Sequence, residues 1–167
     1  YYAESIAHIV LKSKEDNDSR SRTVLANAIA DHIHEPSILI PIPSSTTNNR
    51  RRGFDHSAKL AEKVAKISAS KVCTAISVTR KVKDQTALSH AMRFSNLSGA
   101  YTVNSQLLKS MMGNGAGHPI VLIDDLVTSG ASMREAIHSL RKSGLKAQIR
   151  AISACIASHH LPNTISQ

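Results

Sequence analysis

The segment from Ile120 to Ser132, with the sequence IVLIDDLVTSGAS, constrains this chain more than any other. Four apolar residues lead to two adjacent carboxylates, Asp124 and Asp125, and a loop of small residues then opens a helical pattern. Two acids at the end of a strand can hydrogen-bond a vicinal diol, and backbone N–H groups at a helix N-terminus can bind phosphate. The segment therefore predicts a site for ribose 5-phosphate.

Other interpretations of the phosphate-like signals in the sequence are weaker. The segment itself could be a strand-end turn with a Thr or Ser helix cap, but burying two adjacent acids without a ligand would cost free energy. The glycine-rich segment 113–117 is weakly similar to a dinucleotide-binding fingerprint. It precedes a strand instead of following one, which indicates a flexible turn. The sequence has no G-x-x-x-x-G-K-S/T pattern, which argues against a P-loop NTPase.

The alternation of helical and strand patterns predicts an α/β fold with a mostly parallel sheet, helices on both faces, and ligands at the carboxyl ends of the strands. The length of 167 residues fits a single domain over 1–167. Residues 80–98 are polar and too long for a simple connection, which predicts a mobile lid. The periodicity predicts helices at 5–12, 23–33, 54–67 and 132–142, and strands at 38–40, 72–79, 101–103, 120–123 and 149–156.

Apolar stripes predict which side of each helix faces the core. In the helix at 23–33 the stripe consists of Val24, Leu25, Ala28 and Ile29. In the helix at 54–67 it consists of Leu60, Ala61, Val64 and Ile67.

Charge and composition narrow the class of partner. The formal net charge is +9, with nine further histidines, which favours an anionic partner, either a phosphorylated small molecule or nucleic acid; an ordinary basic surface is the alternative. No apolar run approaches the ~18–20 residues of a membrane span. The two cysteines, Cys73 and Cys155, fit a reducing cytoplasm and are too few for a zinc site of their own.

Three stretches, in order over roughly residues 38 to 155, resemble a known family. The segment at 120–132 is similar to the motif of type I phosphoribosyltransferases that binds 5-phosphoribosyl 1-pyrophosphate (PRPP). The segment 41–60 is similar to the P-x-P…R-x-R-G-F-N/D-Q stretch of the ComF/GntX family, with His56 where that family usually has Gln. The segment 80–101 is similar to its R…Q-x-x-L-S-x-x-x-R-x-x-N…G-A-F stretch. The four-cysteine zinc module that members often carry is not found in this sequence.

The resemblance implies a Mg²⁺-dependent transfer of the 5-phosphoribosyl group from PRPP to an acceptor that the sequence does not identify. It implies that Asp124, Asp125 and Arg80 act in catalysis, and that the two aspartates contact the ribose hydroxyls and Mg²⁺ directly or through water. The implied PRPP-binding residues beside the aspartates are Ser44, Ser45, Arg50, Arg52, Lys81, Thr128, Ser129, Gly130, Ala131 and Ser132. Thr128 stands where purine-salvage relatives carry an acid, which argues against a hypoxanthine-type substrate.

In a second hypothesis, the protein retains the ligand pocket but does not catalyse a reaction. The resembling family is associated with natural competence, so the protein could be a regulatory component that binds PRPP, single-stranded DNA or a protein of the competence machinery. Arg50, Arg52 and Arg80 would then lie along a DNA track. The aromatic share of 3% argues against base stacking on that track.

Overall fold

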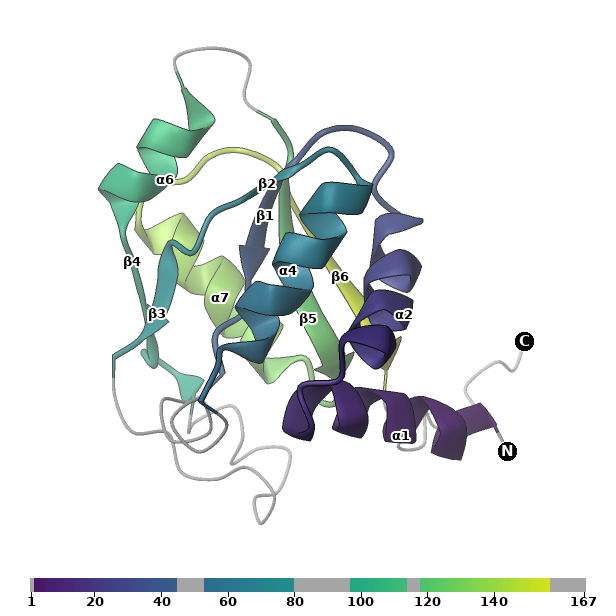
Figure 1. Ribbon diagram of the computed structural model, residues 1–167. Helices are drawn as coiled ribbons and strands as arrows, with labels where there is room; N and C mark the ends of the chain where they lie inside the picture. The colour runs from purple at the N-terminus through teal and green to yellow at the C-terminus, as the bar shows by residue number, and fades with distance from the viewer. Residues whose placement is uncertain (1, 45–52, 80–96, 114–117, 157–167) are drawn as a thin grey trace, which may run out of the picture.

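The computed structural model describes residues 2–44, 53–79, 97–113 and 118–156 (Figure 1). Within them a parallel sheet has the strand order β2-β1-β5-β6, and a small antiparallel pair consists of β3 and β4. The strands are β1 (Ile38–Pro41), β2 (Lys71–Val72), β3 (Ile76–Val78), β4 (Tyr101–Val103), β5 (Ile120–Val127) and β6 (Ile149–Ile156). The predicted α/β fold with a mostly parallel sheet is confirmed.

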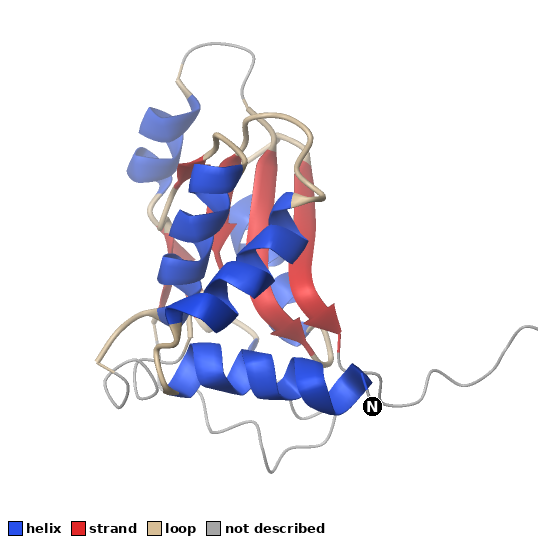
Figure 2. Cartoon of the chain, turned by 45° about the vertical axis from the view of Figure 1, so that its right-hand side comes forward, coloured by secondary structure: helices blue, strands red, loops and turns tan. Residues whose placement is uncertain are grey.

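Helices cover both faces of the parallel sheet (Figures 1 and 2). Their bounds are α1 (Tyr2–Glu15), α2 (Ser19–Ala30), α4 (His56–Ile67), α6 (Ser105–Met112) and α7 (Ala131–Lys142). One face packs against α2 and α4, and the other against α7, α6 and the β3-β4 pair. Helix α1 runs across the end of the sheet where β5 and β6 terminate (Figure 2). None of the helices in the described part of the chain is long and apolar enough to cross a membrane.

The two central strands divide their side chains between two cores. Along β5, Ile120 and Leu122 belong to the core beneath α7, whereas Val121 and Ile123 belong to the core beneath α2 and α4. All four side chains are fully buried. This is the alternation that a pleated strand imposes on successive residues, and it fixes which face each later residue of β5 takes.

The strand predicted at 72–79 is wrong in one respect, because it is two short strands in two sheets. The backbone N–H of Cys73 donates to Leu39 O in the parallel sheet, at 2.8 Å. Two residues later, Ala75 O accepts from the N–H of Asn104, at 2.8 Å, beside the antiparallel pair. The chain therefore passes from one sheet to the other between these residues, which a run of β-formers cannot reveal.

Two further differences concern helices. Helix α6 was not predicted; it begins where the Asn104 side chain accepts from Leu107 N, at 3.0 Å. The predicted stripes are also slightly rotated, because Val24 and Ile67 are 53% and 50% exposed. Tertiary packing decides this detail: α2 lies between α1 and α4 and buries Leu25, Ala26, Ile29 and Ala30.

Candidate functional site

The two adjacent acids lie within β5 and not after it. Strand β5 continues to Val127 because its pairing with β6 continues past the acids, from Asp124 opposite Ser153 to Val127 opposite Ile156. Successive side chains of a strand point to opposite faces. Asp124 and Asp125 are consequently placed in different surroundings.

Asp124 lies on the side of α7. Together with the loop after β5 it lines an open depression whose space is ≈ 210 Å³. The depression is open to solvent, and its lining of small residues leaves room for a small group such as a phosphate. The depression is lined by Asp124, Leu126, Val127, Thr128, Ser129, Gly130, Ala131, Ser132 and Met133.

The loop leads into a helix whose N-cap residue is a glycine. Gly130 is the N-cap of α7, with φ +71°, in the left-handed region that other L-residues occupy only at a cost of about 1–2 kcal/mol. As the N-cap residue, Gly130 supplies no side-chain cap, and the first turn of α7 contains no acid. The one side-chain contact at this end is a long hydrogen bond of 3.4 Å from the backbone N–H of Ala131 to the Ser129 hydroxyl. The Arg134 guanidinium donates to Ser129 O at 3.0 Å and braces the loop from outside. The partial positive charge of this helix end is therefore directed at the depression.

The carboxyl group of Asp124 has a pKa raised well above its ordinary value. Burial is the main cause, and the charge of Asp125 raises the pKa further, whereas Lys14 lowers it. Its Oδ1 accepts a hydrogen bond of 3.0 Å from the backbone N–H of Asp125. A hydroxyl donor or a cation in the depression would favour its ionised form.

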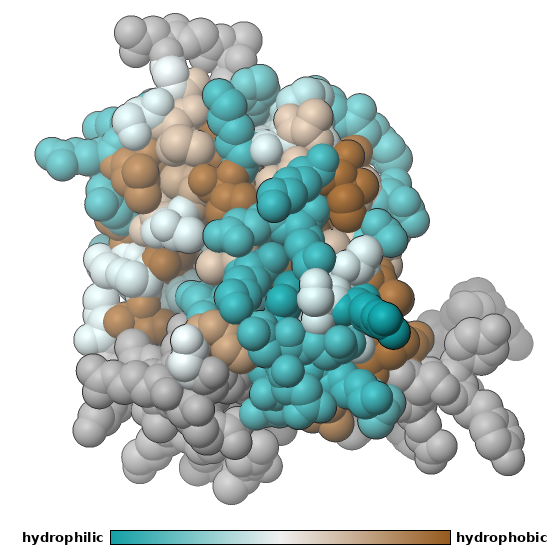
Figure 3. Space-filling view, in the orientation of Figure 1, coloured by the Kyte–Doolittle hydropathy of each residue, from teal (hydrophilic) through white to brown (hydrophobic). Residues whose placement is uncertain are grey.

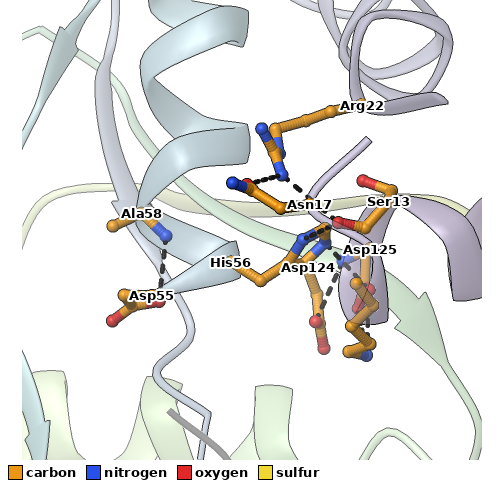
Figure 4. Close-up of polar contacts among 9 residues, drawn as sticks. Ser13, Asn17, Arg22, Asp55, His56, Ala58, Asp124 and Asp125 are labelled. Atoms are coloured by element: carbon orange, nitrogen blue, oxygen red, sulfur yellow. Dashed lines mark hydrogen bonds and ion pairs between the residues drawn. The ribbon is translucent and has the colours of Figure 1, made fainter. Parts of the chain in front are cut away.

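Asp125 lies on the opposite face and is 3% exposed (Figure 4). The Lys14 ammonium is 2.8 Å from its Oδ2 and 3.0 Å from its Oδ1, and His56 Nε2 is 3.2 Å from Oδ2. Burial alone would raise the pKa of Asp125, but the contact with His56 and the charge of Lys14 together hold it well below its ordinary value. Asp125 is therefore a buried anion with two partners.

A polar cluster holds these partners in place (Figure 4). The carbonyl oxygen of Ser13 is 3.2 Å from His56 Nδ1 and accepts a hydrogen bond of 3.2 Å from Arg22 Nη2. Arg22 also donates to Asn17 Oδ1 at 2.7 Å. At the start of α4, the Asp55 side chain accepts from Ala58 N at 3.2 Å and so fixes the helix turn that carries His56.

The structure adds two residues that sequence reasoning missed. Lys14 is 111 positions from Asp125 in the sequence, so no local pattern indicated the contact. Tyr101 of β4 lies beside the start of α7, and burial raises its pKa to about 12, with a smaller rise from the charges of Asp124 and Glu135 and an opposing hydrogen bond to Ser132. The phenol is thus neutral at physiological pH. The G-A-Y sequence was the one signal that could have indicated it.

The remaining predicted site residues divide into two groups. Ser44 is among the described residues and is partly exposed. Two residues before it, the N–H of Ile42 donates to Ile123 O at 2.9 Å, so the chain leaves β1 beside the acids of β5. Ser45, Arg50, Arg52, Arg80 and Lys81 lie outside the described residues, as does most of the predicted lid. Their roles stay predictions, as does a direct contact of Asp125 with a ligand.

A metal would depend on the ligand for most of its donors. The described residues include no group of three or more His, Cys, Asp or Glu side chains that could hold a metal ion. Asp124 offers a carboxylate at the depression, whereas Asp125 is engaged by Lys14. Mg²⁺ is commonly bound by one or two carboxylates together with substrate phosphates. This donor set fits Mg²⁺ that a phosphorylated ligand carries.

Comparisons with known proteins identify the domain family and the fold. The sequence model of the phosphoribosyl transferase domain family matches residues 50–162. No curated protein matches the chain. One similar solved structure is the allosteric regulatory enzyme of purine biosynthesis, with a TM-score of 0.50, 18% identity, and coverage of 80% of this chain and 25% of that one. Another is glutamine PRPP amidotransferase from B. subtilis, with a TM-score of 0.52 and 16% identity. That match covers 80% of this chain and 26% of the other. The chain thus spans about a quarter of the length of these two enzymes, and the likeness concerns the fold.

Proposed function

This chain belongs to the phosphoribosyl transferase domain family, and from that premise we propose that it transfers the 5-phosphoribosyl group of PRPP to an acceptor. The observation that carries the proposal is a single depression that combines Asp124 with the start of α7, where the N-cap residue is a glycine. The N-terminus of a helix binds phosphate favourably, and a carboxylate accepts hydrogen bonds from ribose hydroxyls.

The described residues have separate tasks in this proposal. Backbone N–H groups and hydroxyls of residues 128–132 hold the 5-phosphate, and Asp124 accepts hydrogen bonds from the ribose hydroxyls. When the bond from the anomeric carbon to pyrophosphate breaks, positive charge develops on the ribose ring, and the nearby Asp124 carboxylate stabilises it. Mg²⁺ bound to the substrate oxygens would neutralise charge on the departing pyrophosphate.

Several finer assignments belong to the same proposal. Ser44 and Ser45, with Arg50 and Arg52, would face the pyrophosphate, and Arg80 and Lys81 would reach it from the segment 80–98. Membership of the ComF/GntX branch is supported by the three sequence stretches between residues 38 and 155. A cytoplasmic location is supported by the two cysteines, both of which are free thiols.

Ligand-induced stabilisation tests the proposal. PRPP with Mg²⁺ should raise the melting temperature by mass action, and ribose 5-phosphate should do so at higher concentration. Asp124→Asn should remove most of the rise while the protein stays folded, and the double variant with Asp125→Asn should remove it entirely. An unchanged rise in the double variant would contradict the assignment. An acceptor screen that measures released pyrophosphate would then identify the second substrate.

The competing hypothesis of single-stranded DNA binding has one observation in its favour. The net charge is +9, and hydrophilic side chains gather over α4 and the junction of α1 with α2 (Figure 3). Of the described aromatic side chains, however, Tyr101 is buried and Phe54 is contacted by Lys59, 4.6 Å from its ring centre. Neither offers a free platform for bases.

Paired titrations separate the two hypotheses. Arg50→Ala and Arg80→Ala should weaken PRPP binding and leave oligonucleotide binding nearly intact if these side chains line the pyrophosphate site. On a DNA track, each deleted phosphate contact should reduce the salt slope of oligonucleotide binding by roughly 0.7. Loss of DNA binding alone in both variants would favour the binding component over the enzyme.

A further inference from the structure

The motif on β5 is supported by a residue from outside the matched family domain. The match begins at residue 50, whereas Lys14 belongs to the last turn of α1, which crosses the carboxyl ends of β5 and β6 (Figure 2). Its ammonium contacts both oxygens of Asp125, at 2.8 and 3.0 Å. A segment outside the matched residues is therefore joined directly to the acidic motif.

This contact has little freedom. The Asp125 side chain is 3% exposed and that of Lys14 is 25% exposed, so water cannot readily replace the ammonium. The backbone beside Lys14 is held as well, because Ser13 O accepts from Arg22 and lies 3.2 Å from His56 Nδ1. Helices α1, α2 and α4 thus contribute to one arrangement that keeps the Asp125 carboxylate on the face away from the depression.

The effect reaches the ligand side through the backbone. The N–H of Asp125 donates to Asp124 Oδ1 at 3.0 Å, and Asp124 lines the depression. A displacement of the Asp125 side chain would move this amide and release the Asp124 carboxylate from its orientation. A carboxylate must be held within about 0.5 Å of its productive position to contribute fully.

We propose that Lys14 is a positioning residue of the ribose subsite: it fixes Asp125 and, through the backbone amide of Asp125, orients the carboxylate of Asp124 toward the ribose hydroxyls. The inference rests on the proposed function, because it assumes that Asp124 faces ribose. Lys14 itself touches no atom of the depression and is not assigned a chemical step.

The test compares ribose 5-phosphate with 2-deoxyribose 5-phosphate, which lacks one hydroxyl, by calorimetric titration. The unaltered chain should bind the ribose compound more tightly. Lys14→Met keeps the length of the side chain without its charge, and it should reduce that preference about tenfold, or ~1.4 kcal/mol. Binding of the deoxy compound, which depends more on the phosphate loop, should change little. General loss of structure would weaken both ligands alike.

Two control variants and one alternative variant complete the design. Lys14→Arg restores a cation and should recover the preference. Lys12→Met removes a charge from the same helix at an exposed position that the structure does not bring to Asp125, and it should leave the preference intact. If Lys14→Met does not fold, Lys14→Gln combined with Asp125→Asn replaces the ion pair with two neutral amides and should show the same loss.

The results for these variants separate the role of Lys14 from the proposed function. A preference that survives in Lys14→Met, or that Lys12→Met reduces equally, would overturn the role of Lys14 and leave the proposed function standing. Failure of the unaltered chain to bind either sugar phosphate, or PRPP with Mg²⁺, would overturn both.

Discussion

Asp124 and Asp125 are neighbours on one strand, but the two faces of the sheet treat them in opposite ways. On the side of α7, Asp124 faces the depression and its pKa is raised, chiefly by burial. On the side of α1 and α4, Asp125 is buried against Lys14 and His56 and its pKa is lowered. The protein itself balances the negative charge of Asp125. A ligand in the depression would balance the negative charge of Asp124.

Two acids that are adjacent in the sequence therefore occupy unlike environments in the structure. A protein can place an uncompensated charge at a binding site only if the surrounding structure tolerates its cost. Here Asp125 is balanced by Lys14 and His56, whereas Asp124 faces the depression.

Neutralising the two acids should change stability with opposite signs. Asp125→Asn leaves Lys14 and His56 without their anion and should lower the free energy of unfolding by about 3 kcal/mol at pH 7. Asp124→Asn removes a charge that the fold disfavours, as its raised pKa shows, and should leave that free energy unchanged or raise it. Urea unfolding without ligand measures both. Equal destabilisation by the two variants would abolish the distinction between the faces.

The contribution of Asp125 should vanish in acid. Because its folded pKa is below its unfolded value of about 3.9, the stabilisation is complete above that pH and is lost as pH falls through the folded pKa. The gap in unfolding free energy between the unaltered chain and Asp125→Asn should be full at pH 6 and narrow below about pH 4. A gap that does not change with pH would mean that shape, and not charge, is what the substitution removed.

Two glycines at opposite ends of α7 provide a matched pair for the ligand face. Gly130 has φ +71° and Gly144 has φ +91°, and an added Cβ meets no atom closer than 4.0 Å at either position. Gly130→Val and Gly144→Val should both cost stability, by about 1–2 kcal/mol or more. Only Gly130→Val should weaken ribose 5-phosphate binding, by at least ~10-fold or about 1.4 kcal/mol. Similar affinities in the two variants would remove the phosphate from this loop.

The smallest effect is expected at Tyr101. Tyr101→Phe keeps the buried ring and removes the hydroxyl that interacts with Ser132, so ribose 5-phosphate binding should weaken by about fivefold at most, or ~1 kcal/mol. Absorbance titration checks the assignment, because the tyrosine that ionises near pH 12 should be missing from the variant. A variant that still shows this late ionisation would refute the placement of the phenol.

The sequence predicted the features that depend on neighbouring residues. Apolar runs such as 120–123 indicated buried parallel strands, and the strand predicted at 149–156 has the observed bounds of β6. The small residues 128–132 were predicted to form a phosphate loop, which stays a prediction; the structure places them with Asp124 around one depression. These are local signals, because strand periodicity and helix-end chemistry involve residues that are close in sequence.

The features that were missed depend on distant parts of the chain. The end of β5 is set by its pairing with β6, and that pairing places the acids inside the strand, on opposite faces. The break between Cys73 and Ala75 is set by partners at Leu39 and Asn104. The contact of Lys14 with Asp125 spans 111 positions. No pattern within one segment specifies such contacts, so periodicity alone could not predict them.

The same long-range contacts have a consequence for the order of folding. Strand β1 pairs with β5 through Ile38 and Ile120, so the centre of the sheet requires segments some eighty positions apart to meet. Contacts of such separation close slowly, and parallel sheets are among the slow-folding topologies. During synthesis α1, α2 and β1 emerge long before β5, with their apolar faces uncovered. The depression also needs the start of α7, and the sheet is complete only when β6 pairs with β5, so we expect both to be among the last parts of this protein to form.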